Sequence, residues 1–136
     1  MSSLSGRYLV ADLLTKDLPG HAPIVDGILW EKDNIIFVGK EKAGKSIFSL
    51  QLACSLTTCH PFLGEYDIPK ALSVAYIQAE GKLADTKWHL TRMLKVIPCD
   101  QTKMSIFYYP ALALDTELGL KELTLQIDAW QRPDII

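Results

Sequence analysis

A short run between Gly39 and Ser46 carries the residue types that hold phosphate. Its sequence, GKEKAGKS, fits the pattern G-x-x-x-x-G-K-S/T in full. Glycines suit such a loop because it wraps a phosphate so closely that a Cβ would collide, and because several positions need backbone angles open mainly to glycine. Lys45 would bring a positive charge to the β- and γ-phosphates, and the Ser46 hydroxyl would be a ligand for Mg²⁺. The run therefore predicts a site for ATP or ADP with Mg²⁺.

The segments on either side of this loop have the patterns that would position it. Asn34 to Val38 is short, apolar and β-branched, which predicts a strand buried on both faces in the interior of a sheet. From Lys45 to Leu56 apolar residues fall on nearly every side of a helix, as in a helix packed into an interior. The helix would begin at the end of the loop and add its positive N-terminal dipole to the phosphate site.

A carboxylate follows the next predicted strand. Leu72 to Gln78 reads as a strand, and Glu80 comes directly after it. In a doubly wound sheet, ligands bind beyond the carboxyl ends of the strands, so Glu80 could face the γ-phosphate and deprotonate an attacking water. The alternative is a solvated acidic residue at the end of a strand.

Strands and helices alternate along the rest of the chain. This order implies an α/β fold with a parallel sheet, helices on both faces and right-handed crossovers. Further helices are predicted in 8–14, 83–97 and 120–130, a strand in 104–109, and the start of another strand in 133–136.

Composition favours one soluble domain. The 136 residues carry a net charge of −2 without a basic stripe, and the three cysteines lack the paired spacing of a zinc site or disulfide framework. No signal peptide or membrane-length apolar run is present, so a cytoplasmic protein without a membrane partner is expected. We divide the chain into a flank, 1–22, and a domain, 23–136.

Four stretches, taken together, resemble the RecA-like ATPases related to the RepA plasmid replicative helicase, an AAA family. The resemblance covers about residues 23 to 95 and rests on DGIL, NIIFVGKEKAGKSIFSLQLACSL, PFLG and VAYIQAEG. It implies a three-layer P-loop fold with a mostly parallel sheet, truncated before the Walker B aspartate. By the same resemblance, Glu80 matches the glutamate that activates water.

Motif and resemblance give one set of candidate site residues. Lys45 and Glu80 are the catalytic candidates and Ser46 is the metal ligand. Arg92 stands where these ATPases often carry an arginine that approaches the nucleotide, although an exposed helical arginine is the alternative. The side chains of Lys40 and Lys42 occupy variable positions of the motif and are expected in solvent. The predicted nucleotide-binding residues are Gly39, Lys42, Ala43, Gly44, Lys45, Ser46, Ile47 and Arg92.

The resemblance also implies partners. Its members form hexameric rings that hold ATP between neighbours and thread single-stranded DNA, so a homo-hexamer acting in DNA unwinding or remodelling, in replication or repair, is expected of the complete protein. The final RPDII looks like the lead into the Walker B strand. The metal-organising aspartate, DNA-contacting loops and arginine finger would then follow Ile136, and the chain alone would hydrolyse ATP weakly or not at all.

Two other functions stay open from the sequence. A P-loop kinase acting on a small molecule would need an acceptor-binding acidic group and a lid of arginines, and neither is evident. A module in which nucleotide only switches conformation, without catalysis, is the second alternative.

Overall fold

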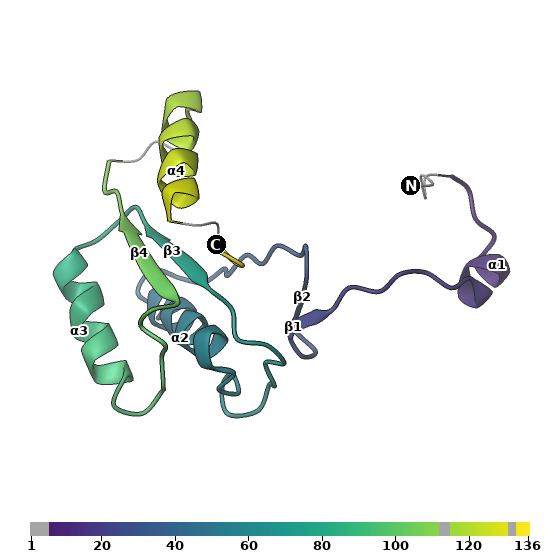
Figure 1. The fold of residues 1–136 in the computed structure, drawn as a ribbon, viewed down its shortest axis with the longest axis horizontal. Helices are drawn as coiled ribbons and strands as arrows, with labels where there is room; N and C mark the ends of the chain where they lie inside the picture. The colour runs from purple at the N-terminus through teal and green to yellow at the C-terminus, as the bar shows by residue number, and fades with distance from the viewer. Residues whose placement is uncertain (1–5, 112–114, 131–132) are drawn as a thin grey trace.

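The computed structural model describes residues 6–111, 115–130 and 133–136. Helices and strands alternate through most of it, as expected (Figure 1). In chain order they are α1 (Val10–Thr15), β1 (Pro23–Val25), β2 (Leu29–Trp30), α2 (Lys45–Thr58), β3 (Val74–Gln78), α3 (Leu83–Met93), β4 (Met104–Tyr108) and α4 (Glu117–Ala129).

The sheet at the centre of the molecule is parallel, which confirms the predicted pairing. β3 and β4 align in register from Val74 opposite Met104 to Gln78 opposite Tyr108, and α3 forms the crossover that parallel neighbours require. On its other edge β3 makes a single parallel bridge, from Val74 to Ile135. β1 and β2 form a separate antiparallel pair.

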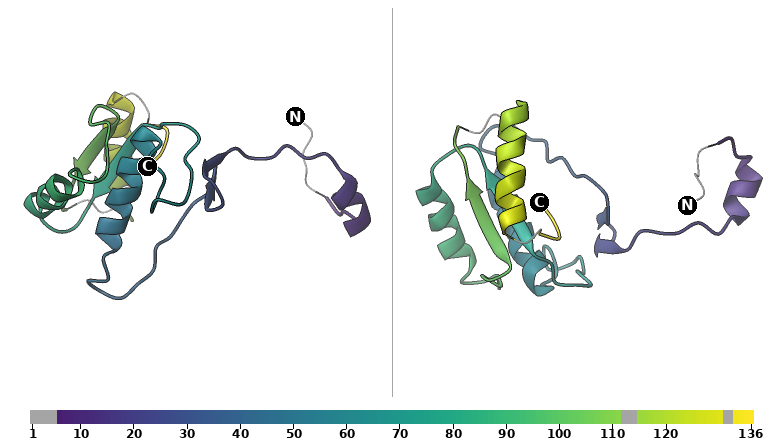
Figure 2. Two further views of the ribbon diagram at one scale, coloured as in Figure 1. Left: turned by 90° about the horizontal axis from the view of Figure 1, so that it is seen from below. Right: turned by 45° about the horizontal axis from the view of Figure 1, so that its top comes forward.

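Helices pack on both faces of β3 and β4. The Tyr76 hydroxyl lies 3.0 Å from Ser49 Oγ of α2. Phe107, on the opposite face because successive side chains of a strand alternate, has its ring 5.8 Å from that of Trp130, just after α4. The right-hand view of Figure 2 shows α4 in front of the sheet and α2 behind it. The structure is therefore a small α/β fold with a parallel sheet.

Helix α2 is the centre of the hydrophobic core. Its apolar residues contact one cluster that includes Val25 and Phe62 and a second that includes Met93. Because the two clusters contact different sides of α2, the helix is buried on most sides, as its sequence predicts. Burying each large side chain stabilises the fold by roughly 1.5–3 kcal/mol. Its buried apolar residues are Leu50, Leu52, Ala53, Cys54 and Leu56.

The predicted buried strand at Asn34 to Val38 is wrong for this structure. The segment is extended but forms no strand, and every one of its residues is exposed. A strand needs a neighbour for its backbone groups, and among the described residues none pairs with this segment. The segment does contact α2 through one side chain: the centre of the Phe37 ring lies 5.1 Å from that of Phe48.

The two ends of the chain contribute little to the core. Residues 6–22 are all exposed and α1 buries none of its residues, while residues 1–5 of the predicted flank lie outside the described part. Figure 1 shows α1 far from the sheet. The strand expected at 133–136 amounts to the single bridge of Ile135. In the described ranges, no helix has the length and apolarity needed to cross a membrane.

Candidate nucleotide-binding site

The predicted phosphate loop is a turn that leads directly into α2. Gly44 has φ 89° and precedes the first helical residue, Lys45. That left-handed conformation costs other residues about 1–2 kcal/mol, which explains the glycine. The Gly44 carbonyl accepts a hydrogen bond from the Phe48 N–H at 3.0 Å, so the helix starts immediately after the loop.

The first turn of α2 presents free hydrogen-bond donors. Across the described part of the chain, the backbone N–H groups of Lys45, Ser46 and Ile47 have no hydrogen-bond partner. Such groups at a helix N-terminus carry partial positive charge and form a ready site for an anion. Ser46 and Ile47 are both exposed, so a phosphate can reach these amides.

The Lys45 ammonium forms hydrogen bonds with the start of the loop. Lys45 Nζ donates to the carbonyl of Gly39 at 2.7 Å and to that of Lys40 at 2.9 Å. These two carbonyls hold the positive charge at the loop that precedes α2, where a phosphate oxygen would compete with them for it. A Cβ on Gly39 would lie 3.6 Å from Ala43 Cβ, an ordinary contact, so protein neighbours alone do not require glycine there.

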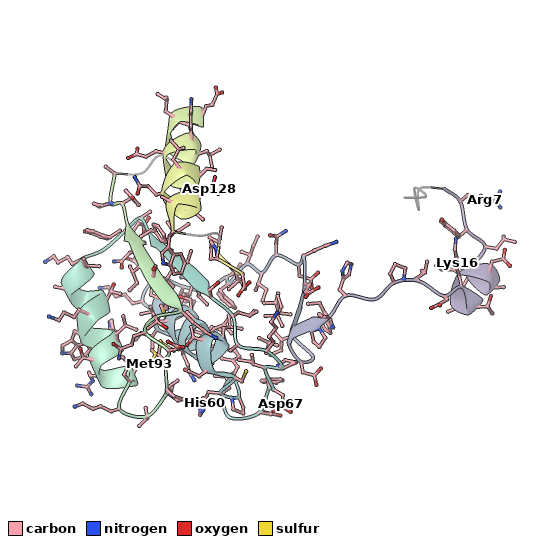
Figure 3. All side chains as sticks on the ribbon, in the orientation of Figure 1. Arg7, Lys16, His60, Asp67, Met93 and Asp128 are labelled. Carbon is pink, nitrogen blue, oxygen red and sulfur yellow. The ribbon has the colours of Figure 1, made fainter. Side chains whose placement is uncertain are left out.

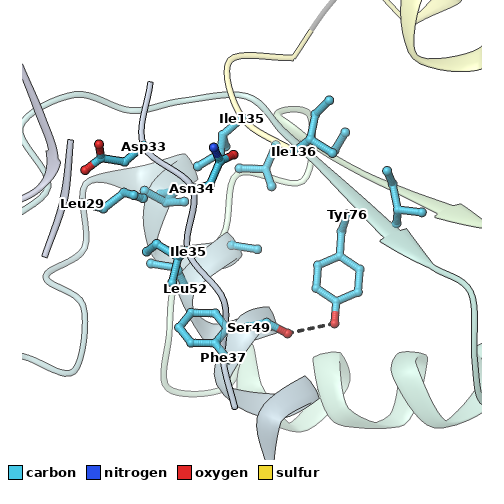
Figure 4. Close-up of a pocket in the computed structure, with 15 residues that line it drawn as sticks. Leu29, Asp33, Asn34, Ile35, Phe37, Ser49, Leu52, Tyr76, Ile135 and Ile136 are labelled. Atoms are coloured by element: carbon cyan, nitrogen blue, oxygen red, sulfur yellow. Dashed lines mark hydrogen bonds between the residues drawn. The ribbon is translucent and has the colours of Figure 1, made fainter. Parts of the chain in front are cut away.

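A pair of hydroxyl groups joins the start of α2 to the sheet. Ser49 Oγ donates to the Ser46 carbonyl at 2.9 Å and lies 3.0 Å from the Tyr76 hydroxyl of β3 (Figure 4). Sequence reasoning missed both residues. Ser49 lies one helical turn after Ser46, and this spacing could have indicated that the two residues share a face of the helix. The direction in which Tyr76 points depends on the register of β3, which the sequence does not give.

The turn that carries Glu80 is held at several points. Gln78 Nε2 donates to the Glu80 carbonyl at 2.9 Å, and Gln78 Oε1 accepts from Thr86 Oγ1 at 2.6 Å. The Tyr108 hydroxyl donates to the carbonyl of Gly81, whose φ is +77°. The Glu80 side chain itself is exposed at the carboxyl end of β3, and in the described ranges it makes no hydrogen bond to the loop.

Arg92 lies away from this turn. Its guanidinium carbon sits 4.7 Å from the centre of the Trp88 ring, one helical turn earlier in α3. Arg92 lies near the C-terminal end of α3, about 14 Å along the helix from Leu83, which follows the Glu80 turn. The neighbouring Met93 is labelled in Figure 3 and marks this end of α3. These contacts favour the exposed helical arginine over an arginine that approaches the nucleotide.

The cysteines do not form a second site. No group of metal-ligating side chains occurs in the part of the chain that the structure describes. Burial, and secondarily the neighbouring Cys99, raise the pKa of the Cys54 thiol to about 12, so this thiol stays protonated at neutral pH.

A family model described as an AAA domain matches residues 4–128. The chain belongs to this AAA domain family. The match includes the phosphate loop and the turn with Glu80, and membership indicates an ATPase-type, nucleotide-binding function. AAA ATPase domains are expected to bind ATP with Mg²⁺. No match to the chain was found among curated proteins or among solved structures.

The residues of the loop suit this nucleotide. The free amides of α2 and the Lys45 ammonium provide donors for phosphate oxygens, and the exposed Ser46 provides an oxygen of the kind that Mg²⁺ prefers. The groups at the N-terminus of α2 in this AAA domain are therefore of the types that bind Mg-ATP.

Proposed function

We propose that this AAA domain binds Mg-ATP through Gly39 to Ser46 and is the nucleotide-binding part of a RecA-like ATPase. The observation that carries the proposal is that the unpartnered amides of Lys45, Ser46 and Ile47 begin α2 directly after a loop whose carbonyls hold the Lys45 ammonium. Backbone donors, a helix dipole and a lysine are the groups that bind a triphosphate.

Each residue of the loop has a separate task in this proposal. The amides bind phosphate oxygens, and Lys45 exchanges the carbonyls of Gly39 and Lys40 for the β- and γ-phosphates. The Ser46 hydroxyl is a ligand for Mg²⁺, which, when bound, offsets the negative charge that develops on the phosphates. Ser49 and Tyr76 keep the first turn of α2 fixed against β3 while the phosphates bind.

Glu80 is the general base of the proposal. It stands at the carboxyl end of β3, and its carboxylate would accept a proton from the attacking water. The hydrogen bonds from Gln78 and Tyr108 hold the backbone of its turn, so the side chain is the part free to turn toward the water.

The wider assignment rests on the resemblance to relatives of the RepA replicative helicase. It comprises a three-layer RecA-like domain over 23–136 after a flank at 1–22, assembly as a homo-hexamer, and coupling of ATP hydrolysis to the unwinding or remodelling of single-stranded DNA in the cytoplasm. DNA-stimulated ATP hydrolysis, measured on a form of the chain extended past Ile136, tests it. Phosphate transfer to a small molecule instead would indicate a kinase, and binding without turnover a regulatory module.

Calorimetric titration with Mg-ATP tests the nucleotide site. We expect Lys45→Ala to weaken binding by at least about 10-fold, because an ammonium that pairs with phosphate contributes on the order of 1.5–3 kcal/mol. Lys42→Ala is the matched control, since its side chain is exposed in the same loop. Equal affinity of the Lys45→Ala and Lys42→Ala proteins would overturn the assignment.

A further inference from the structure

Helix α3 carries an exposed aromatic ring and a local excess of positive charge. Figure 1 shows this helix at the left-hand edge of the described chain. Trp88, near its middle, is 56% exposed. Of the chain's 14 basic and 16 acidic residues, residues 82–97 contain four basic and one acidic, so the rest of the chain is net acidic. The four basic residues are Lys82, Lys87, Arg92 and Lys95.

Helical spacing brings the ring and two of the cations to one side. Arg92 follows Trp88 by four residues, and Lys95 lies in the next turn, where its N–H donates to the Arg92 carbonyl at 3.3 Å. Residues with this spacing share a face of a helix. The Arg92 guanidinium carbon is 4.7 Å from the centre of the Trp88 ring, a contact that holds the two side chains together. We call these residues and the adjoining Lys87 the α3 face.

The cations of the α3 face are available to an anionic ligand. Within the ranges that the structure describes, Lys87, Arg92 and Lys95 form no ion pair with a carboxylate. All three are exposed. The other side of the helix packs into the core through Met93, which is 8% exposed. The fold therefore fixes the α3 face in place without using its charges.

The combination of one exposed ring with several cations indicates which anion fits. A lipid surface requires a broad apolar face along a helix. Leu83, the other exposed large apolar residue of α3, lies about 140° around the helix from Trp88, so no such face exists. In a duplex the bases are stacked on one another, whereas a single strand offers base faces to an aromatic side chain and phosphates to cations.

We propose that the α3 face binds single-stranded nucleic acid, with a base stacked on the Trp88 ring and phosphates paired with Lys87, Arg92 and Lys95. The inference deepens the proposed function, on which it rests for a DNA partner, by assigning a surface to that partner. Stacking tolerates any base, because every base has a flat aromatic face. Binding should therefore depend little on nucleotide sequence.

Fluorescence anisotropy of a labelled oligothymidylate, titrated with the full chain at low salt and without ATP, tests the stacking. We expect Trp88→Ala to weaken binding at least about 5-fold, and Trp88→Phe, which keeps an aromatic ring, to retain most of the affinity. Trp30→Ala is the matched control, because Trp30 is also exposed but lies next to Glu31 and near the Asp33 carboxylate. No binding, or equal affinities of Trp88→Ala and Trp30→Ala, would overturn the proposal.

Salt dependence tests the cations. Three phosphate contacts predict that the logarithm of the association constant falls with the logarithm of salt concentration at a slope of about −2. Replacing both Lys87 and Lys95 by alanine should reduce the slope to about −0.7. Lys121→Ala, on the exposed side of α4, should leave it unchanged. An unaltered slope in the double variant would contradict the phosphate contacts.

Two further ligands and one further titration separate the possible explanations. Tighter binding to a DNA duplex, or to phosphatidylserine vesicles, than to the oligothymidylate would overturn the choice of a single strand. Calorimetry with Mg-ATP should give the same affinity for Trp88→Ala as for the unaltered chain, because Trp88 is not part of the phosphate loop. Failure of the α3 face would thus appear in the DNA titration, and failure of the nucleotide assignment in the Lys45→Ala titration.

Discussion

At the scale of single residues, the phosphate loop depends on one left-handed glycine and one lysine. Gly44 connects the loop to the helix, and its positive φ lets α2 begin at the next residue, Lys45, whose Nζ returns to the loop carbonyl of Gly39. The lysine donates to the carbonyls of Gly39 and Lys40, and these hydrogen bonds restrict its side chain. A restricted side chain loses less conformational entropy when it binds a phosphate.

Gly44→Ala tests this connection. We expect it to lower the free energy of unfolding by about 1–2 kcal/mol, because alanine resists the left-handed conformation. Gly20→Ala is the control, since Gly20 is exposed, has open space at its Cβ and does not have a φ in that range. Urea denaturation measures both, and equal midpoints would contradict the explanation.

Glu80→Gln tests the general base in a form of the chain with measurable ATP turnover. A base acts in the transition state, so kcat should fall about 10²- to 10⁴-fold while ATP affinity stays nearly unchanged. Glu41→Gln, an exposed carboxylate in the phosphate loop, should retain its rate. If Glu80→Gln keeps more than about half of kcat, Glu80 is a solvated residue.

At the scale of elements, the turn between β3 and α3 is fixed by side chains from three elements. Gln78 of β3 connects the Glu80 carbonyl to Thr86 of α3, and Tyr108 of β4 holds Gly81. Thr86 is 93% buried, with 7% of its surface exposed, so its hydroxyl has few other partners. This network keeps the turn at one place on the sheet edge.

Thr86→Val tests the network. Valine has nearly the same shape but leaves Gln78 Oε1 without its donor, so we expect a loss of about 1 kcal/mol in the free energy of unfolding. Thr91→Val is the control on the same helix, because Thr91 is exposed and its hydroxyl bonds only to the Lys87 carbonyl. Equal free energies of unfolding for the two variants in chemical denaturation would show that the Thr86–Gln78 hydrogen bond does not stabilise the fold.

At the scale of the whole molecule, the unpaired segment Asn34 to Val38 leads directly into the phosphate loop. Val38 ends the unpaired segment, and Gly39 begins the loop whose carbonyl holds Lys45. An interaction that orders the segment would therefore also restrict the loop. Binding events that each order the same segment favour one another.

The sequence by itself determined the local parts of this protein. The motif from Gly39 to Ser46 predicted a loop that ends where a helix begins, and the apolar residues of Lys45 to Leu56 predicted a helix buried on most sides; both agree with the structure. The alternation of β3, α3 and β4 also followed from periodicity. These features depend on the backbone conformation and burial of one segment, so the order of residue types within that segment is enough to predict them.

Tertiary structure decided what depends on neighbours. Asn34 to Val38 has the composition of a buried strand, yet it stays unpaired because no described segment forms hydrogen bonds with its backbone. The hydrogen bonds of Tyr76 with Ser49, and of Gln78 with Thr86, depend on strand register and helix rotation, which no single segment encodes. A strand exists only when another chain segment satisfies its backbone, so composition predicts the capacity to pair and the fold decides whether pairing occurs.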